Sequence, residues 1–291
     1  MILFISSFED EDLKKFAKNF NNYYGIKTRY INTGEFLSNQ PFSVYIKKNS
    51  LGSVILKEDF DSVKICYLNS QLFVNPDDFD YSNKKDTDYA LQEWSAAFLA
   101  LFGTQENTRF INPFLRKYNF ASEIEQLLIM QRSGLDTIDM ALSNNSGDVI
   151  ELNKIWNKCT IMKESTMGYA KSTSFTQDKF LKLPMLKYTP CIFQEGKVGE
   201  NIEILILAEE YLAMDLNNSS FIEIPKGLKE RLLDFCNQSK IKFATFNAVI
   251  VNGRYYFYCA NQYPVFSMIK SIYQDNFIAM FEKFLVKEYQ S

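Results

Sequence analysis

The chain has 291 residues, which is enough for about two domains of roughly 150 residues and for a sizeable hydrophobic core. It contains no histidine, and this excludes Ser-His-Asp triads, Cys-His dyads and HExxH zinc sites. The formal net charge of −3 gives no basic excess, so we expect no nucleic-acid partner. Five cysteines without a CxxC pair predict reduced thiols in the cytoplasm, and no apolar run reaches the ~18 residues of a membrane helix.

Alternating strands and helices are predicted for the N-terminal part of the chain. Ile2–Ser6 is a short apolar run typical of a strand. Leu13, Phe16 and Phe20 then recur at the spacing of one helix face, and Ile26–Ile31 alternates like a second strand. A β-α-β unit of this kind predicts a parallel sheet with a right-handed crossover.

Further elements precede a predicted domain boundary. Strands are predicted over Phe42–Lys47, Val54–Lys57 and Val63–Leu68, and a helix is predicted over Tyr89–Phe102. Asn112 comes directly before a proline and therefore resists helical conformation. We expect the first domain to end there.

Antiparallel hairpins dominate the predictions for the second half of the chain. The predicted helices are Ser122–Ser133, Leu228–Cys236 and Ile272–Lys287, and the predicted strands are Thr137–Leu142, Cys159–Met162, Cys191–Gln194, Ile202–Ala208, Tyr211–Leu216, Phe243–Val251 and Tyr255–Ala260. The polar segment 164–187 predicts either a flexible connection or a lid. The fold class is therefore α/β in the first half and α+β in the second.

Four blocks of the sequence, taken in order, resemble the ATP-grasp ligases that close rings in ribosomal peptides, namely the microviridin and GRASP-with-SPASM maturases. Residues 2–33 are similar to the opening strand, helix and strand of that family, and residues 110–145 to its helix with a K-L-x-Q-L motif. Residues 189–216 are similar to its P-x-x-F-Q-E hinge and E-I-R strand, and residues 244–266 to its I-D-F-I and F-L-E-V-N-P strands. The likeness covers nearly the whole chain as order and spacing.

This resemblance implies a fold and a chemistry. It implies an N-terminal α/β domain over residues 1–112, a central grasp subdomain over 113–188 and a C-terminal grasp subdomain over 189–291. In such ligases ATP lies between two antiparallel sheets, and magnesium binds its phosphates. ATP phosphorylates a carboxylate, and a nucleophile of the precursor peptide then attacks the resulting acyl phosphate.

Four positions keep residues that the resemblance assigns to the nucleotide site. Lys163 stands at the family's second ATP-contacting lysine, and Gln194 and Glu195 stand at the adenine and ribose hinge. Asn261 keeps the metal-facing asparagine. Each has a plainer alternative: a strand-end surface lysine for Lys163, solvent-facing positions for Gln194 and Glu195, and a turn former for Asn261.

Other positions depart from the family. Glu123 and Glu203 replace a lysine and an arginine that face phosphate, and segment 66–70 has neither arginine of the family's W-Y-R-R-G strand end. Asn247 and Cys259 replace the metal-binding aspartate and glutamate, although Cys259 also has the plainer interpretation of a small core residue. Two like charges about 4 Å apart repel by roughly 4 kcal/mol at an effective dielectric constant of 20. A thiol is also a soft ligand that suits magnesium poorly.

Three functions are therefore compared. The first is an ATP-grasp homologue with impaired catalysis that binds a precursor peptide or a partner maturase. The second is an active ATP-dependent peptide ligase that forms side-chain lactams or lactones and uses ATP and magnesium, whereas the first needs no cofactor. The third is an unrelated soluble α/β binding protein. The sequence predicts no membrane partner and leaves a homodimer open.

Overall fold

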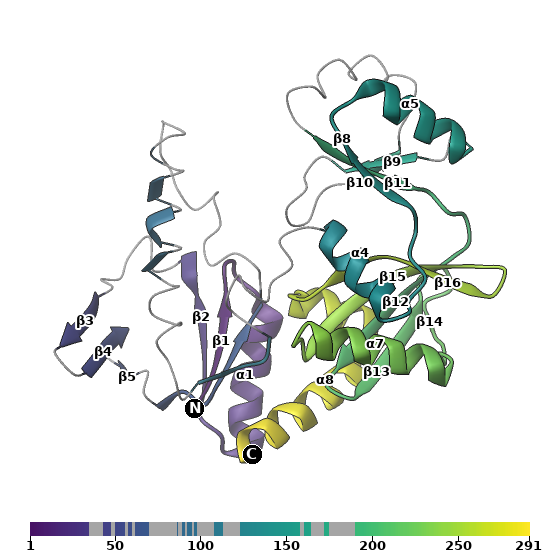
Figure 1. Ribbon diagram of the computed structural model, residues 1–291. Helices are drawn as coiled ribbons and strands as arrows, with labels where there is room; N and C mark the ends of the chain where they lie inside the picture. The colour runs from purple at the N-terminus through teal and green to yellow at the C-terminus, as the bar shows by residue number, and fades with distance from the viewer. Residues whose placement is uncertain are drawn as a thin grey trace.

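The computed structural model describes residues 1–34, 43–47, 50–55, 58–59, 62–69, 86, 89–90, 92–94, 96–97, 108–112, 123–157, 160–163, 172–174 and 190–291. The ribbon shows an N-terminal sheet on one side, a C-terminal sheet with helices beside it, and a small sheet with one helix above the latter (Figure 1). None of the described helices is long and apolar enough to cross a membrane.

The N-terminal sheet has the strand order β2-β1-β6-β7, and every pair in it is parallel. Its elements are β1 (Ile2–Ser6), α1 (Glu11–Tyr24), β2 (Thr28–Asn32), β6 (Ile65–Leu68) and β7 (Arg109–Phe110). Asp10 caps α1 by accepting a hydrogen bond from Leu13 N, and Gly25 ends the helix in the left-handed conformation at φ +64°. The predicted β-α-β opening is thus confirmed.

A second, antiparallel sheet in this part has the order β3-β4-β5, with β3 (Ser43–Lys47), β4 (Ser50–Ile55) and β5 (Glu58–Asp59). The strand predicted over Val54–Lys57 instead begins at Ser50 and ends at Ile55. Of the helix predicted over Tyr89–Phe102, residues 89–90, 92–94 and 96–97 are helical, and the others lie outside the described residues.

The small sheet is antiparallel and has the order β10-β9-β11-β8. Its strands are β8 (Met140–Ser143), β9 (Thr160–Lys163), β10 (Ser172–Ser174) and β11 (Cys191–Glu195), and its helix is α5 (Ser146–Ile155). Helix α4 (Glu123–Arg132) precedes it. The segment predicted as a flexible connection or lid thus contains one strand, β10, and the rest of that segment lies outside the described residues.

The C-terminal sheet is antiparallel and has the order β14-β13-β12-β15-β16. Its elements are β12 (Glu200–Leu207), β13 (Glu210–Asp215), β14 (Ser220–Phe221), α7 (Lys226–Gln238), β15 (Phe243–Val251), β16 (Arg254–Asn261) and α8 (Phe266–Gln290). The predicted strands Ile202–Ala208 and Tyr211–Leu216 form one antiparallel hairpin, and Phe243–Val251 and Tyr255–Ala260 form another, which confirms the predicted hairpins of the second half. The last helix begins at Phe266, six residues before the predicted start at Ile272, and has a break in helical geometry at Gln274.

Each face of the C-terminal sheet has its own core. On one face, Ile202, Ile204 and Phe246 pack with residues of α4 and α7. On the other face, Leu205 and Phe243 belong to a cluster that also contains residues of β1, α1, β6 and α8. This second cluster joins residues from both sides of the boundary predicted at residue 112, so the N-terminal sheet and the C-terminal sheet share one core.

Side chains of the N-terminal part cap the start of α8. Helix α8 has no capping side chain of its own at Val265. Asn69 Oδ1 instead accepts a hydrogen bond from Phe266 N at 2.7 Å, and Asp10 Oδ2 accepts one from Ser267 N at 3.3 Å. Tyr67 Oη donates to Pro264 O at 3.1 Å. The chain between β16 and α8 is therefore fixed by groups far away in the sequence.

Asn112 makes a comparable link. Its Oδ1 accepts hydrogen bonds from Lys242 N at 3.0 Å and Phe243 N at 2.9 Å, and its Nδ2 donates to Phe243 O and Gln262 O. The side chain is buried, and these four bonds use its whole hydrogen-bonding capacity. Asn112 thus ties the end of the N-terminal part to both ends of the β15–β16 hairpin.

Candidate functional site

Three of the replaced positions form one row across the C-terminal sheet. Glu203 of β12 lies directly opposite Asn247 of β15, and Asn247 lies directly opposite Cys259 of β16. Side chains directly opposite one another lie on the same face of a sheet. The structure therefore brings together an acid, an amide and a thiol at positions that the resemblance assigns to phosphate and metal contacts.

The carboxyl group of Glu203 is largely shielded from solvent. Its Oε1 atom is buried and has no hydrogen-bond partner among the described residues. Burial raises the pKa of Glu203 to about 7, and the nearby Tyr273 hydroxyl opposes that rise. Tyr273 Oη donates a hydrogen bond to the main-chain oxygen of Glu203 at 2.9 Å. An uncompensated buried carboxylate favours a proton or a cation and disfavours a phosphate.

The amide and the thiol of the row contact each other. Asn247 Nδ2 donates to Cys259 Sγ at 3.3 Å, at the place where the register of β15 and β16 shifts. Cys259 is half-buried, so its interpretation as a core residue is wrong. Burial, followed by the charges of Cys259 and Glu203, raises the pKa of Tyr258 to about 12. The amide and the thiol of the row are therefore engaged with each other, beside an acid whose pKa is raised.

The predicted hinge residues lie at the end of β11, next to β16. Gln194 is buried, so a solvent-facing position for it is wrong, and its Nε2 donates to Tyr258 O at 3.4 Å. Glu195 is half-buried and pairs with Lys197, with Nζ and Oε2 at 2.6 Å. Lys197 Nζ also lies 4.7 Å from the centre of the Tyr256 ring. Gln194 therefore bridges two sheets, and the Glu195 carboxylate already has a cationic partner.

The remaining predicted residues are placed as follows. Asn261 ends β16, and its Oδ1 accepts a hydrogen bond from Tyr263 N at 2.9 Å, which is the turn contact that the plainer interpretation expects. Lys163 ends β9, and its main chain pairs with β11 opposite Ile192. Glu123 is the first residue of α4. The side chains of Lys163 and Glu123 lie outside the described part of the structure.

Metal-ligating side chains do not gather in this row. Within the described residues, no group of three or more cysteine, aspartate and glutamate side chains is placed to hold a metal ion. Magnesium prefers several hard oxygen ligands, mostly carboxylates. One amide engaged with a thiol and one acid whose pKa is raised do not provide such a set.

Comparisons with solved structures cover almost the whole chain. The ATP-grasp ligase PsnB complexed with its minimal precursor has a TM-score of 0.81 at 16% identity, over 99% of this chain and 98% of that one. The macrocyclase MdnC from Microcystis aeruginosa, bound with precursor peptide MdnA, has a TM-score of 0.76 at 16% identity, over 93% and 94%. The chain has the ATP-grasp fold. No protein-family model and no curated protein matches it.

A third ATP-grasp structure agrees with these two. The RiPP-associated ligase from Chryseobacterium gregarium, in complex with ADP and with a leader and core peptide, has a TM-score of 0.75 at 15% identity, over 95% of this chain and 93% of that one. The expected likeness to ring-closing peptide maturases is therefore confirmed at the level of the fold. The alternative of an unrelated α/β fold is wrong.

Two contacts of the candidate site were not predicted from the sequence. Tyr273 lies 70 residues after Glu203 in the chain and reaches it only because α8 packs on β12. No local pattern signals such a contact. Lys197 lies two residues after Glu195, and this spacing of opposite charges was a signal that the sequence did offer.

Proposed function

We propose that this protein acts in the maturation of a ribosomally made peptide by binding a precursor peptide or a partner maturase, with impaired ligase chemistry and no cofactor of its own. The ATP-grasp fold supports the general class, since three similar structures contain precursor, leader or core peptides. The row formed by Glu203, Asn247 and Cys259 carries the proposal of impairment.

The residues in this row do not fit a magnesium nucleotide. A triphosphate needs cations beside its oxygens, whereas Glu203 offers only a buried carboxyl group, which is neutral or negative and never positive. Magnesium needs hard anionic ligands, whereas Asn247 and Cys259 offer an amide and a soft thiol that already contact each other. Both features oppose the binding of ATP with magnesium at this place.

An active ligase is the second candidate, and the hinge favours it. Gln194 is buried between β11 and β16, as expected of a residue that shapes a cleft between two sheets. Glu195 and Asn261 are also retained, but their side chains are engaged with Lys197 and Tyr263. If the protein is an active ligase, ATP and magnesium must displace these local contacts when they bind.

An assay of ADP release separates the two candidates. The protein is mixed with ATP, magnesium and candidate short acidic peptides, and ADP is measured together with peptide mass and peptide affinity. We expect peptide binding without added nucleotide, no ADP above the peptide-free control, and unchanged peptide mass. Peptide-dependent ADP release with loss of one water mass would establish the active ligase instead.

A further inference from the structure

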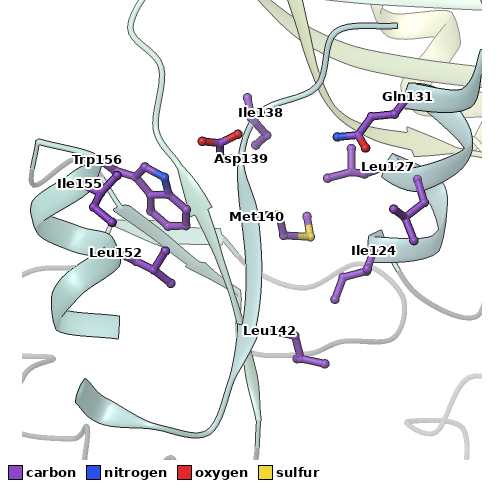
Figure 2. Close-up of a pocket in the computed structure, with 11 residues that line it drawn as sticks. Ile124, Leu127, Gln131, Ile138, Asp139, Met140, Leu142, Leu152, Ile155 and Trp156 are labelled. Carbon is purple, nitrogen blue, oxygen red and sulfur yellow. The ribbon is translucent and has the colours of Figure 1, made fainter. Parts of the chain in front are cut away.

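A groove lies away from the row of Glu203, Asn247 and Cys259, along the outer edge of the small sheet. Its volume is about 480 Å³, within the usual range of binding pockets. Strand β8 runs along the middle of the groove, with α4 on one side and α5 on the other (Figure 2). Ile124 and Leu127 line the α4 side, whereas Leu152 and Trp156 line the α5 side.

Exposed apolar side chains gather at this groove. Leu128, Leu142 and Ile155 all line it, and they are 48%, 48% and 68% exposed. Contiguous exposed apolar surface on a folded protein marks a place where something binds. The only charged residue of the lining is Asp139, which is exposed, so the groove has net negative charge among its described lining residues.

Strand β8 also has main-chain groups that pair with no described strand. Among the described strands it pairs with β11 alone, along one edge. Glu195 N donates to Asp139 O at 2.9 Å, which marks Asp139 as a hydrogen-bonded position of the ladder. Hydrogen-bonded positions alternate in an antiparallel pair, so Met140 and Leu142 direct their N–H and C=O groups to the other edge. Those two residues also line the groove.

We infer that this groove takes an extended peptide segment that adds as a further strand to β8, with three consecutive apolar residues followed by a basic one. This inference rests on the proposed function of peptide binding. The open edge of β8 requires an extended main chain, as in other cases of strand addition. The apolar residues opposite Met140 and Leu142 contact the α4 side, and the residue between them contacts the α5 side.

The basic residue follows from charge complementarity. In the added strand, the residue opposite Asp139 has its side chain on the same side of β8 as Trp156. Figure 2 shows the Asp139 carboxylate on that side. An antiparallel segment therefore has the pattern apolar-apolar-apolar-basic. The stretch from Met140 to Leu142 spans about 10 Å at ~3.3 Å per residue, so it matches three residues of such a segment.

The test uses the peptide acetyl-Thr-Leu-Val-Leu-Lys-Thr-amide and two N-methylated forms of it. Methylation of both leucine nitrogens removes the N–H groups that would donate to Met140 and Leu142, whereas methylation of the valine nitrogen alters an N–H that points away from β8. We expect the parent and valine-methylated peptides to bind within about twofold of each other and the leucine-methylated peptide to bind at least about tenfold more weakly. Equal binding of both methylated forms would overturn the inference.

Hydrogen exchange reports on the strand edge directly. In the free protein the amides of Met140 and Leu142 should exchange quickly and that of Ala141 slowly, and the parent peptide should slow the first two. Slow exchange of Met140 and Leu142 without peptide would mean that the chain covers its own edge. Absence of added protection at millimolar peptide would equally exclude strand addition.

Matched variants locate the groove and separate this inference from the proposed function. Leu142→Asp and Ile155→Asp should each weaken binding of the parent peptide by at least about tenfold, because each places a charge on an apolar contact. Ile150→Asp, on an exposed position of α5 outside the lining, should leave affinity unchanged. If Leu142→Asp binds the natural precursor as the wild type does, only the groove assignment fails. If the wild type binds no precursor at all, the proposed function fails.

Discussion

At the scale of single residues, Glu203 is the most informative side chain of the molecule. It lies where the family resemblance places an arginine, and its Oε1 is buried without a partner among the described residues. A carboxyl group that is buried without a partner holds its proton more tightly, so its pKa rises. The protonation of Glu203 can therefore be followed through the pH dependence of the stability of the fold.

Glu203→Gln should remove a pH dependence of stability. The folded-state pKa is raised from 4.5 to about 7, so the folded chain holds this proton more tightly than the unfolded chain does. Its stabilising contribution is fully present below pH about 4.5 and is lost as pH rises through about 7. We expect wild-type stability to fall by about 2–3 kcal/mol over this range and the variant to lack that part of the fall.

Denaturant unfolding of both proteins across this range measures the effect. Glu209→Gln, at an exposed turn between β12 and β13, is the control and should behave like the wild type. A Glu203→Gln curve parallel to the wild-type curve would mean that Glu203 is ionised and solvated in the folded chain.

At the scale of secondary-structure elements, α8 depends on caps from another part of the chain. Asn69 accepts from Phe266 N and donates to Asp10 Oδ2 at 2.9 Å, and all three residues are buried. Removing one partner leaves buried donors and acceptors unsatisfied. The start of α8 and the turn after Asn261 therefore depend on the carboxyl end of β6.

Asn69→Ala should lower the free energy of unfolding by about 2–3 kcal/mol, because Phe266 N and Asp10 Oδ2 both lose a buried partner. Asn22→Ala, on the exposed surface of α1, should change it by less than about 0.5 kcal/mol. Thermal or denaturant unfolding provides the measurement. Equal stability of the two variants would show that water replaces Asn69 as the cap.

Local signals predicted many elements, and long-range contacts account for what they missed. The helix face of Leu13, Phe16 and Phe20 was sufficient to predict α1, and the strand patterns of Phe243–Val251 and Tyr255–Ala260 were sufficient to predict the last hairpin. The early start of α8 at Phe266 was not predictable, because its caps come from Asn69 and Asp10. The strand registers that place Glu203, Asn247 and Cys259 in one row could not be predicted from the sequence, because they depend on how distant strands pair.

At the scale of the whole molecule, one aromatic core crosses the predicted domain boundary at residue 112. The ring of Phe281 on α8 lies 5.4 Å from that of Phe16 and 5.3 Å from that of Tyr67, both in the N-terminal part. It also lies 5.8 Å from Phe243 of β15. Helix α8 thus lies between α1 and the C-terminal sheet and packs against both.

Phe281→Ala should therefore destabilise both parts together, by about 3–5 kcal/mol. Hydrogen exchange should quicken by the same factor in β1 and β15, because one core supports both strands. Met268→Ala, at an exposed position of α8, is the matched control and should leave exchange unchanged. Loss of protection in β15 alone would indicate that residues 1–112 form an independent domain.

The central claim is that an ATP-grasp scaffold here carries residues unsuited to a magnesium nucleotide. Calorimetry of ATP with magnesium tests it most directly when the wild type is compared with the triple variant Glu203→Arg, Asn247→Asp and Cys259→Glu. We predict millimolar or weaker affinity for the wild type and at least about tenfold tighter binding for the variant. Micromolar affinity of the wild type, or equal affinity of the two proteins, would contradict the claim.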